Sequence, residues 1–303
     1  MLYASALAVL ASTLLTVGLY FMKREAERLP SLEGGWRLAA WWAFMRNRWW
    51  RFGFMLQIAG YGLYFLSLRF APLSIVHAVQ NGGIALFVLL AVFRLGEDPR
   101  PVEWFAIVVI TVSLIILSLS FASAPAVSVA EHGTLLFSLV VMVLAALALA
   151  VDRQPARTIG LSVASGLVLG LAAVYAKGLA NGIGLTADAA FHLLLSVAAN
   201  LVGFAMMQAA FQRGRGVMVM PLFAALSNLV PIIGGILVFG EALPSQEPAA
   251  VLRPLAFTLA ILGAALLAGF GEHTGPAFSQ PGASVNARTG PLHGAQDRPG
   301  GRP

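Results

Sequence analysis

The chain has 303 residues, of which 59% are hydrophobic and 11% are charged, and a formal net charge of +6. Soluble domains carry roughly 25% charged residues, so this composition excludes an ordinary soluble protein. The absence of Cys excludes disulfides, thiolate catalysis and Cys-ligated metals. The basic residues lie in short loops between apolar segments rather than in one patch, which argues against nucleic acid as a partner.

Nine apolar segments follow one another along the chain, and each is long enough to cross a bilayer as a helix. They are predicted at residues 2–22, 52–69, 72–94, 103–121, 134–151, 158–180, 188–211, 216–239 and 252–270. No basic residue precedes the first segment and Lys23 and Arg24 follow it directly, so we interpret it as a retained helix rather than a signal peptide. Residues 273–303 are poor in apolar side chains, and a disordered tail is predicted.

The basic residues also predict the orientation of the chain. With the N-terminus outside, sixteen of the 19 Lys and Arg residues fall in inner loops or in the tail. Only Arg69 and Arg253 fall in outer loops, and Lys177 lies within a segment. The positive-inside rule therefore predicts nine spans with the N-terminus outside and the C-terminus in the cytoplasm, in a bacterial inner (plasma) membrane.

The first inner loop, residues 23–51, holds five of the six Trp residues, interleaved with Arg. Trp at the depth of the lipid headgroups, next to Arg that faces anionic lipid, is typical of an interfacial helix. We expect this loop to anchor the protein on the inner leaflet. A gate or a partner surface is the alternative.

Two stretches share one pattern. Pro72 begins a span that ends at Glu97, and Gly216 begins one that ends at Glu241 at the same spacing. The predicted organisation is a four-span unit in residues 1–122, a linker span in residues 123–157 and a second four-span unit in residues 158–272. Because the two units enter the membrane from opposite sides, they form an inverted repeat, which secondary carriers use to open a central site to each side in turn.

The ends of these two spans, Leu95-Gly96-Glu97 and Phe239-Gly240-Glu241, resemble the signature of the drug/metabolite transporter superfamily, of the EamA-like type. Within it, the nine-span layout, the Trp-rich loop and the run Ala176-Lys177-Gly178-Leu179 resemble the NIPA-type magnesium transporter family. This resemblance covers residues 1–272. It implies an all-α integral membrane fold with a 4+1+4 inverted repeat. It leaves the cargo open, and His77-Ala78 departs from the Thr-Pro that the NIPA-type pattern tends to show.

Polar residues inside the spans are the candidate substrate path. His77, Gln80 and Asn81 share one helix face, and Asn200 and Asn228 fall near the same depth. Together they predict an uncharged, hydrogen-bonding cavity for a polar solute or a hydrated ion. Hydrogen bonding between packed helices is the alternative role for such amides.

Three further features complete the candidate site. Lys177 either extends to the membrane surface or interacts with a charged substrate. Pro221, Pro231 and Gly234 predict a helix break or gate in the eighth span, with an ordinary kink as the alternative. No carboxylate lies in the core of a span, which argues against a dehydrated magnesium site, so the metal ligands are left unknown.

The first functional hypothesis is a transporter that moves a small polar solute or metabolite by alternating access. A NIPA-like carrier of magnesium or another divalent cation is the alternative, and lipid-like cargo is a third. A non-transporting membrane scaffold represents a different class. The sequence lacks the motifs H-E-x-x-H and G-x-S-x-G, so neither an enzyme nor a cofactor is predicted. The expected partners are the substrate and the lipid bilayer, with a homodimer left open.

Overall fold

The computed structural model describes residues 2–32, 38–67, 73–119, 131–150, 156–181, 187–240 and 249–271. Within these ranges all regular secondary structure is α-helical. Six helices are long and apolar enough to cross a bilayer, as expected of an integral membrane protein. The predicted tail at residues 273–303 and the side chain of His77 lie outside the described part of the chain.

The described helices follow the predicted segments closely. They are α1 (Leu2–Ala26), α2 (Leu38–Arg46), α3 (Arg48–Ser67), α4 (Leu73–Leu95), α5 (Pro101–Leu119), α6 (Glu131–Leu149), α7 (Ala156–Asn181), α8 (Ala187–Arg213), α9 (Gly216–Leu237) and α10 (Ala249–Gly271). α2 lies in the Trp-rich loop, and each other helix overlaps one predicted span. α3 is not among the six strongly apolar helices, because Arg48, Arg51 and Gln57 lower its hydropathy. The number of spans stays a prediction.

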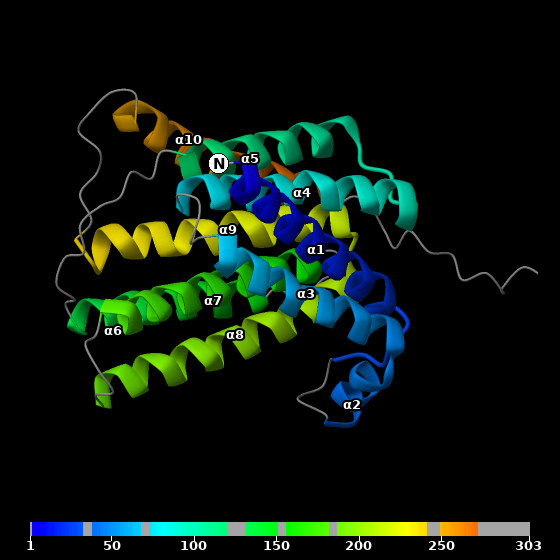
Figure 1. Ribbon diagram of the computed structural model, residues 1–303, viewed down its shortest axis with the longest axis horizontal. Coiled ribbons are helices and arrows are strands. Elements are labelled where there is room, and N and C mark those ends of the chain that lie inside the picture. The colour runs from blue at the N-terminus through cyan, green and yellow to red at the C-terminus, as the bar shows by residue number, and fades with distance from the viewer. Residues whose placement is uncertain are drawn as a thin grey trace, which may run out of the picture.

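The helices of the first half pack in the same pairs as those of the second half. α1 packs on α3 and α4, and α7 packs on α8 and α9. The two halves meet mainly where α5 contacts α10 and α4 contacts α9, and α1 also contacts α8 (Figure 1). The inverted repeat itself stays a prediction.

Small residues allow close approach at matching places in the two halves. A Cβ on Gly83 of α4 would lie 2.7 Å from the hydroxyl of Thr16 on α1. A Cβ on Gly170 of α7 would lie 2.6 Å from a side chain of α9. Close approach of helices through glycine therefore occurs in both predicted units.

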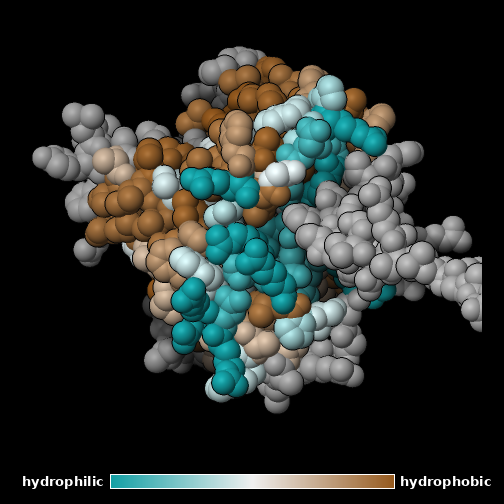
Figure 2. Space-filling view, turned by 90° about the vertical axis from the view of Figure 1, so that its right-hand side faces the viewer, coloured by the Kyte–Doolittle hydropathy of each residue, from teal (hydrophilic) through white to brown (hydrophobic). Residues whose placement is uncertain are grey.

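One end of the bundle is polar. There α1, α4, α6 and α8 end and α5, α7 and α9 begin, and we call it the polar end. Figure 2 looks at this end and shows hydrophilic side chains spread across it, with apolar surface at its margin. It corresponds to the predicted cytoplasmic side.

The Trp residues at the polar end do not all serve as surface anchors. Trp42 and Trp49 are exposed, with 65% and 41% of their surface accessible, as expected of an interfacial segment. Trp50 is fully buried, and its indole N–H donates to Oε1 of Gln208 at 3.1 Å. The prediction of an interfacial role is therefore wrong for Trp50, because α3 begins at Arg48 and turns this residue into the core.

Candidate functional site

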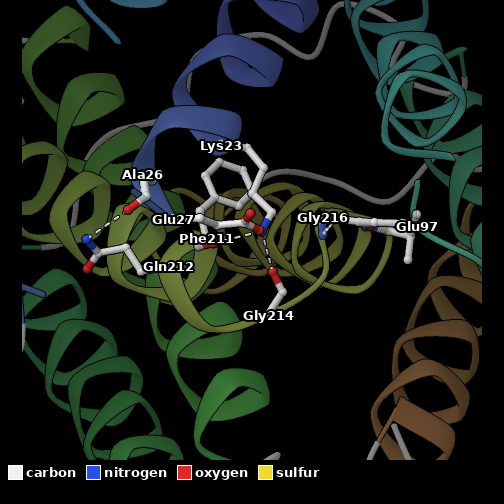
Figure 3. A network of polar contacts seen from close by, with 9 residues as sticks. Lys23, Ala26, Glu27, Glu97, Phe211, Gln212, Gly214 and Gly216 are labelled. Carbon is white, nitrogen blue, oxygen red and sulfur yellow. Dashed lines mark hydrogen bonds and ion pairs between the residues drawn. The ribbon is translucent and has the colours of Figure 1, made fainter. Parts of the chain in front are cut away.

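Lys23 binds the end of α8 from a fully buried position. Its Nζ donates to the carbonyl of Phe211 at 2.8 Å and to that of Gly214 at 2.6 Å, and it pairs with Glu27 just past the end of α1 (Figure 3). The last carbonyls of a helix lack intrahelical partners and carry partial negative charge. Lys23 therefore caps α8, which precedes α9 by a turn at residues 214–215.

Glu97 binds the other side of the same turn. Its Oε1 accepts the N–H of Gly216 at 2.7 Å and its Oε2 accepts that of Val217 at 2.8 Å. These are the first N–H groups of α9, where partial positive charge favours a carboxylate. Gly96, with φ +71°, ends α4 in a left-handed conformation and so allows the chain to turn at this point.

Burial gives Glu97 an unusual electrostatic balance. Only 7% of its surface is exposed. Burial raises the pKa of Glu97 above its ordinary value of 4.5, although the charge of Lys23 and the two N–H contacts act to lower it. The charged form of this carboxyl is therefore both well coordinated and costly to hold in the interior.

Arg215 provides a third contact to the turn. Its guanidinium pairs with the buried carboxylate of Glu103 and donates to the carbonyl of Asp98 at 3.1 Å. Glu103 also accepts the backbone N–H of Arg100 at 2.8 Å, which caps the start of α5. We call Lys23, Glu27, Glu97, Glu103 and Arg215 the clamp.

Gln212 joins α8 to the chain that follows α1. Its Nε2 donates to the carbonyls of Ala26 at 3.1 Å and Pro30 at 3.0 Å, and its Oε1 accepts the N–H of Leu32 at 3.0 Å. With the clamp, these bonds join elements of the first predicted unit to the α8–α9 turn of the second. These contacts between the elements are polar and lie together at the polar end.

Three amides of the predicted substrate path make hydrogen bonds within the helix bundle, and their role in a path stays a prediction. Asn81 is buried and donates to the carbonyl of Leu114 at 3.2 Å and to the hydroxyl of Ser118 at 2.8 Å, so it joins α4 to α5. Asn200 is exposed and Asn228 is half-buried, and each donates to the carbonyl four residues earlier in its own helix. Gln80 is half-buried on α4.

The other predicted residues lie on α7 and α9. Lys177 is half-buried, with Nζ 4.9 Å from the centre of the Phe239 ring. α9 is helical from Gly216 to Leu237 through Pro221 and Pro231, so the chain does not break there. A gating role for these prolines and for Gly234, which packs against Val174, stays a prediction.

A relative supports the resemblance to transporters. The chain is 25% identical over 269 residues to the probable magnesium transporter NIPA9 of Arabidopsis thaliana, and the match covers 83% of this chain and 77% of that protein. No protein-family model matches the chain. No solved structure matches it either. The chain is thus similar over most of its length to a membrane transporter.

The clamp was not predicted from the sequence. The apolar run of the first segment ends at Met22, which predicts Lys23 in an inner loop. In the structure α1 continues to Ala26, and Lys23 is buried inside the protein. Glu97 was expected only as a helix-end or loop carboxylate. One sequence feature points to the clamp. Lys23, Glu97 and Arg215 each lie next to the end of a predicted span, and all three ends are on the predicted inner side.

Proposed function

We propose that the protein is a multi-pass membrane transporter that carries Mg²⁺ by alternating access. The observation that carries this proposal is the similarity, over 83% of the chain, to a probable magnesium transporter. Among the described residues there is no group of three or more His, Asp or Glu that could hold a metal. Mg²⁺ keeps several of its waters when it binds to proteins, so amides and carbonyls suffice to contact the hydrated ion along a path.

The clamp is the closed gate of this transporter at the polar end. It ties α1 and the α4–α5 loop to the α8–α9 turn through buried contacts. To open this end, the cycle has to break the bonds from Lys23 to the α8 carbonyls and the bonds from α9 to Glu97. These bonds come from two elements of the first unit, so a rigid-body movement of one unit against the other breaks them together.

A small polar solute is the second candidate cargo. Lys177 favours it, because a fixed positive charge near the end of α7 repels a divalent cation and attracts an anionic group. Lys177 also lies against an aromatic ring, which holds the cation in place.

The test is magnesium flux into liposomes that contain the purified protein and a magnesium-sensitive dye. Asn228→Ala and Asn200→Ala are matched variants, because both side chains make the same bond to their own helix, at 2.8 Å and 2.9 Å. Asn228 lies on α9, which packs against α4, α5 and α7, whereas Asn200 is exposed on α8. We expect saturable influx that Asn228→Ala reduces by about tenfold, the equivalent of one hydrogen bond to the moving ion, and that Asn200→Ala leaves unchanged.

Absence of influx from folded wild-type protein would contradict the magnesium proposal and direct the assay to anionic solutes. In that assay Lys177→Met would be compared with Arg94→Met, which removes an exposed charge of α4. Solute flux lost in the first variant, with magnesium flux absent, would support the second candidate.

A further inference from the structure

An open groove lies at the polar end between α7 and α8. One part has a volume of about 240 Å³ and is lined by Leu32, Leu149, Arg157, Leu161, Ala209 and Arg213. The adjoining part has a volume of about 200 Å³ and adds Trp41, Val202 and Met206 to the lining. The two parts share Leu32, Leu161 and Ala209, so they are continuous.

The chemistry of the groove changes along its length. Its first part carries the guanidinium groups of Arg157 at the start of α7 and Arg213 at the end of α8. The side chains that the second part adds are apolar or aromatic. Val202 lies about 16 Å before Arg213 along the axis of α8, at 1.5 Å per residue. The groove thus presents two positive charges at the polar end and an apolar part that runs along α8 away from that end.

We propose that this groove binds an anionic phospholipid from the leaflet at the polar end. Arg157 and Arg213 hold the phosphate, since a guanidinium donates paired hydrogen bonds to phosphate oxygens. An acyl chain lies along Leu161, Met206 and Val202. Charge complementarity selects this occupant, because a zwitterionic lipid would place its own cation beside the two arginines and a soluble anion would leave the apolar part empty.

The bound lipid also acts on the clamp. Arg213 lies in the chain between Phe211 and Gly214, whose carbonyls accept the bonds from Lys23. A phosphate held by Arg213 therefore steadies the end of α8 in the position that Lys23 binds. The lipid favours the closed polar end, whatever the cargo.

The experiment is native mass spectrometry of the full chain in a non-ionic detergent, with phosphatidylglycerol, phosphatidylcholine or inorganic phosphate added. We expect phosphatidylglycerol to bind at least about tenfold more tightly than phosphatidylcholine. The double variant Arg157→Gln/Arg213→Gln loses this preference. Arg94→Gln, which removes an exposed charge of α4 at the same end, keeps it.

A second variant tests the apolar part without a change of charge. Ala209→Trp fills the section that the two parts of the groove share and is expected to displace phosphatidylglycerol as the double variant does. Equal binding of the two lipids by the wild type would overturn the proposal. So would equal losses in the double variant and in Arg94→Gln, which would indicate general surface charge, or displacement of phosphatidylglycerol by inorganic phosphate, which would indicate a site for a free anion. If the double variant does not fold, the proposal is tested by Ala209→Trp and by the binding of phosphatidylglycerol and phosphatidylcholine to the wild type.

Discussion

At the scale of single residues, two opposite charges of the clamp bind the two ends of one turn. Lys23 meets the negative end of α8, and Glu97 meets the positive end of α9. Each charge is matched to a helix dipole as well as to hydrogen-bonding partners. This explains how two ionisable groups are kept inside a protein whose charged content is only 11%.

Replacement of Lys23 by Met is expected to destabilise the protein. The substitution leaves the carbonyls of Phe211 and Gly214 buried without their donor, at a cost of about 1–3 kcal/mol. Arg28→Met is the control, since Arg28 is exposed and lies 3.6 Å from Glu25 in a surface pair worth under about 1 kcal/mol. Unfolding by SDS in mixed micelles measures both, and equal losses would contradict the capping role of Lys23.

Glu97 is expected to make stability depend on pH. Because burial raises its pKa in the folded state, the folded protein holds this proton more tightly than the unfolded chain. The resulting stability is present below the ordinary pKa of 4.5 and is lost as the pH rises through the raised pKa. The unfolding free energy of the wild type should therefore fall relative to that of Glu97→Gln over this window, by up to about 1.4 kcal/mol per pH unit.

The pH series needs unfolding curves of both proteins in the same micelles. A constant difference between the wild type and Glu97→Gln from about pH 4 to pH 8 would mean that the pKa of Glu97 is not raised. A difference that changes in the opposite sense would mean that its N–H partners outweigh the cost of burial.

At the scale of the helices, α1 and α3 approach so closely that only glycine fits between them. A Cβ on Gly53 would lie 2.6 Å from the carbonyl oxygen of Gly18, and one on Gly18 would lie 2.7 Å from that of Gly53. Gly53→Ala should force the helices apart at a cost of about 1–3 kcal/mol. Gly62→Ala, also on α3, has nothing within 4 Å and should be neutral or gain up to about 1 kcal/mol from helix propensity.

SDS unfolding of these two variants separates packing from propensity. A similar loss for Gly62→Ala would show that α3 tolerates no added side chain at either place. A neutral result for Gly53→Ala would contradict the close approach of α1 and α3.

The helical fold could be predicted from the sequence, and the contacts between helices could not. The length of each apolar run locates a helix, because a chain in lipid must form its backbone hydrogen bonds within helices. It does not mark helix ends, since buried Lys23 and Trp50 continue α1 and α3 beyond the apolar runs. Nor does it tell which neighbour a polar side chain meets, so the bond from Asn81 to Ser118 on α5 could not be predicted.

At the scale of the whole molecule, buried polar contacts join the predicted units at the polar end. A chain without Cys allows single thiols to report on its opening. Ala210→Cys places a thiol at a fully buried position of α8, beside the carbonyls that Lys23 binds. The reaction of this thiol with a maleimide should be slow. Adding Lys23→Met should make it about tenfold faster, because a loss of about 1.4 kcal/mol of stabilisation makes opening of the polar end about ten times more frequent.

Arg94→Cys is the control for this reaction, because Arg94 is exposed at the same end. It should react quickly with or without Lys23→Met. If the thiol at residue 210 reacts equally slowly with and without Lys23→Met, Lys23 does not control access to the polar end.

The buried Trp50 gives the molecule a built-in optical probe. Its ring stacks on Phe54 with 10° between the planes, and its N–H bonds to Gln208 on α8. The emission of an indole shifts to longer wavelength when water reaches it. Because Trp50 connects α3 to α8, a separation of these helices during a working cycle would shift its emission. With the other five Trp residues replaced by Phe, the protein can be followed in a vesicle by this fluorescence, without a label.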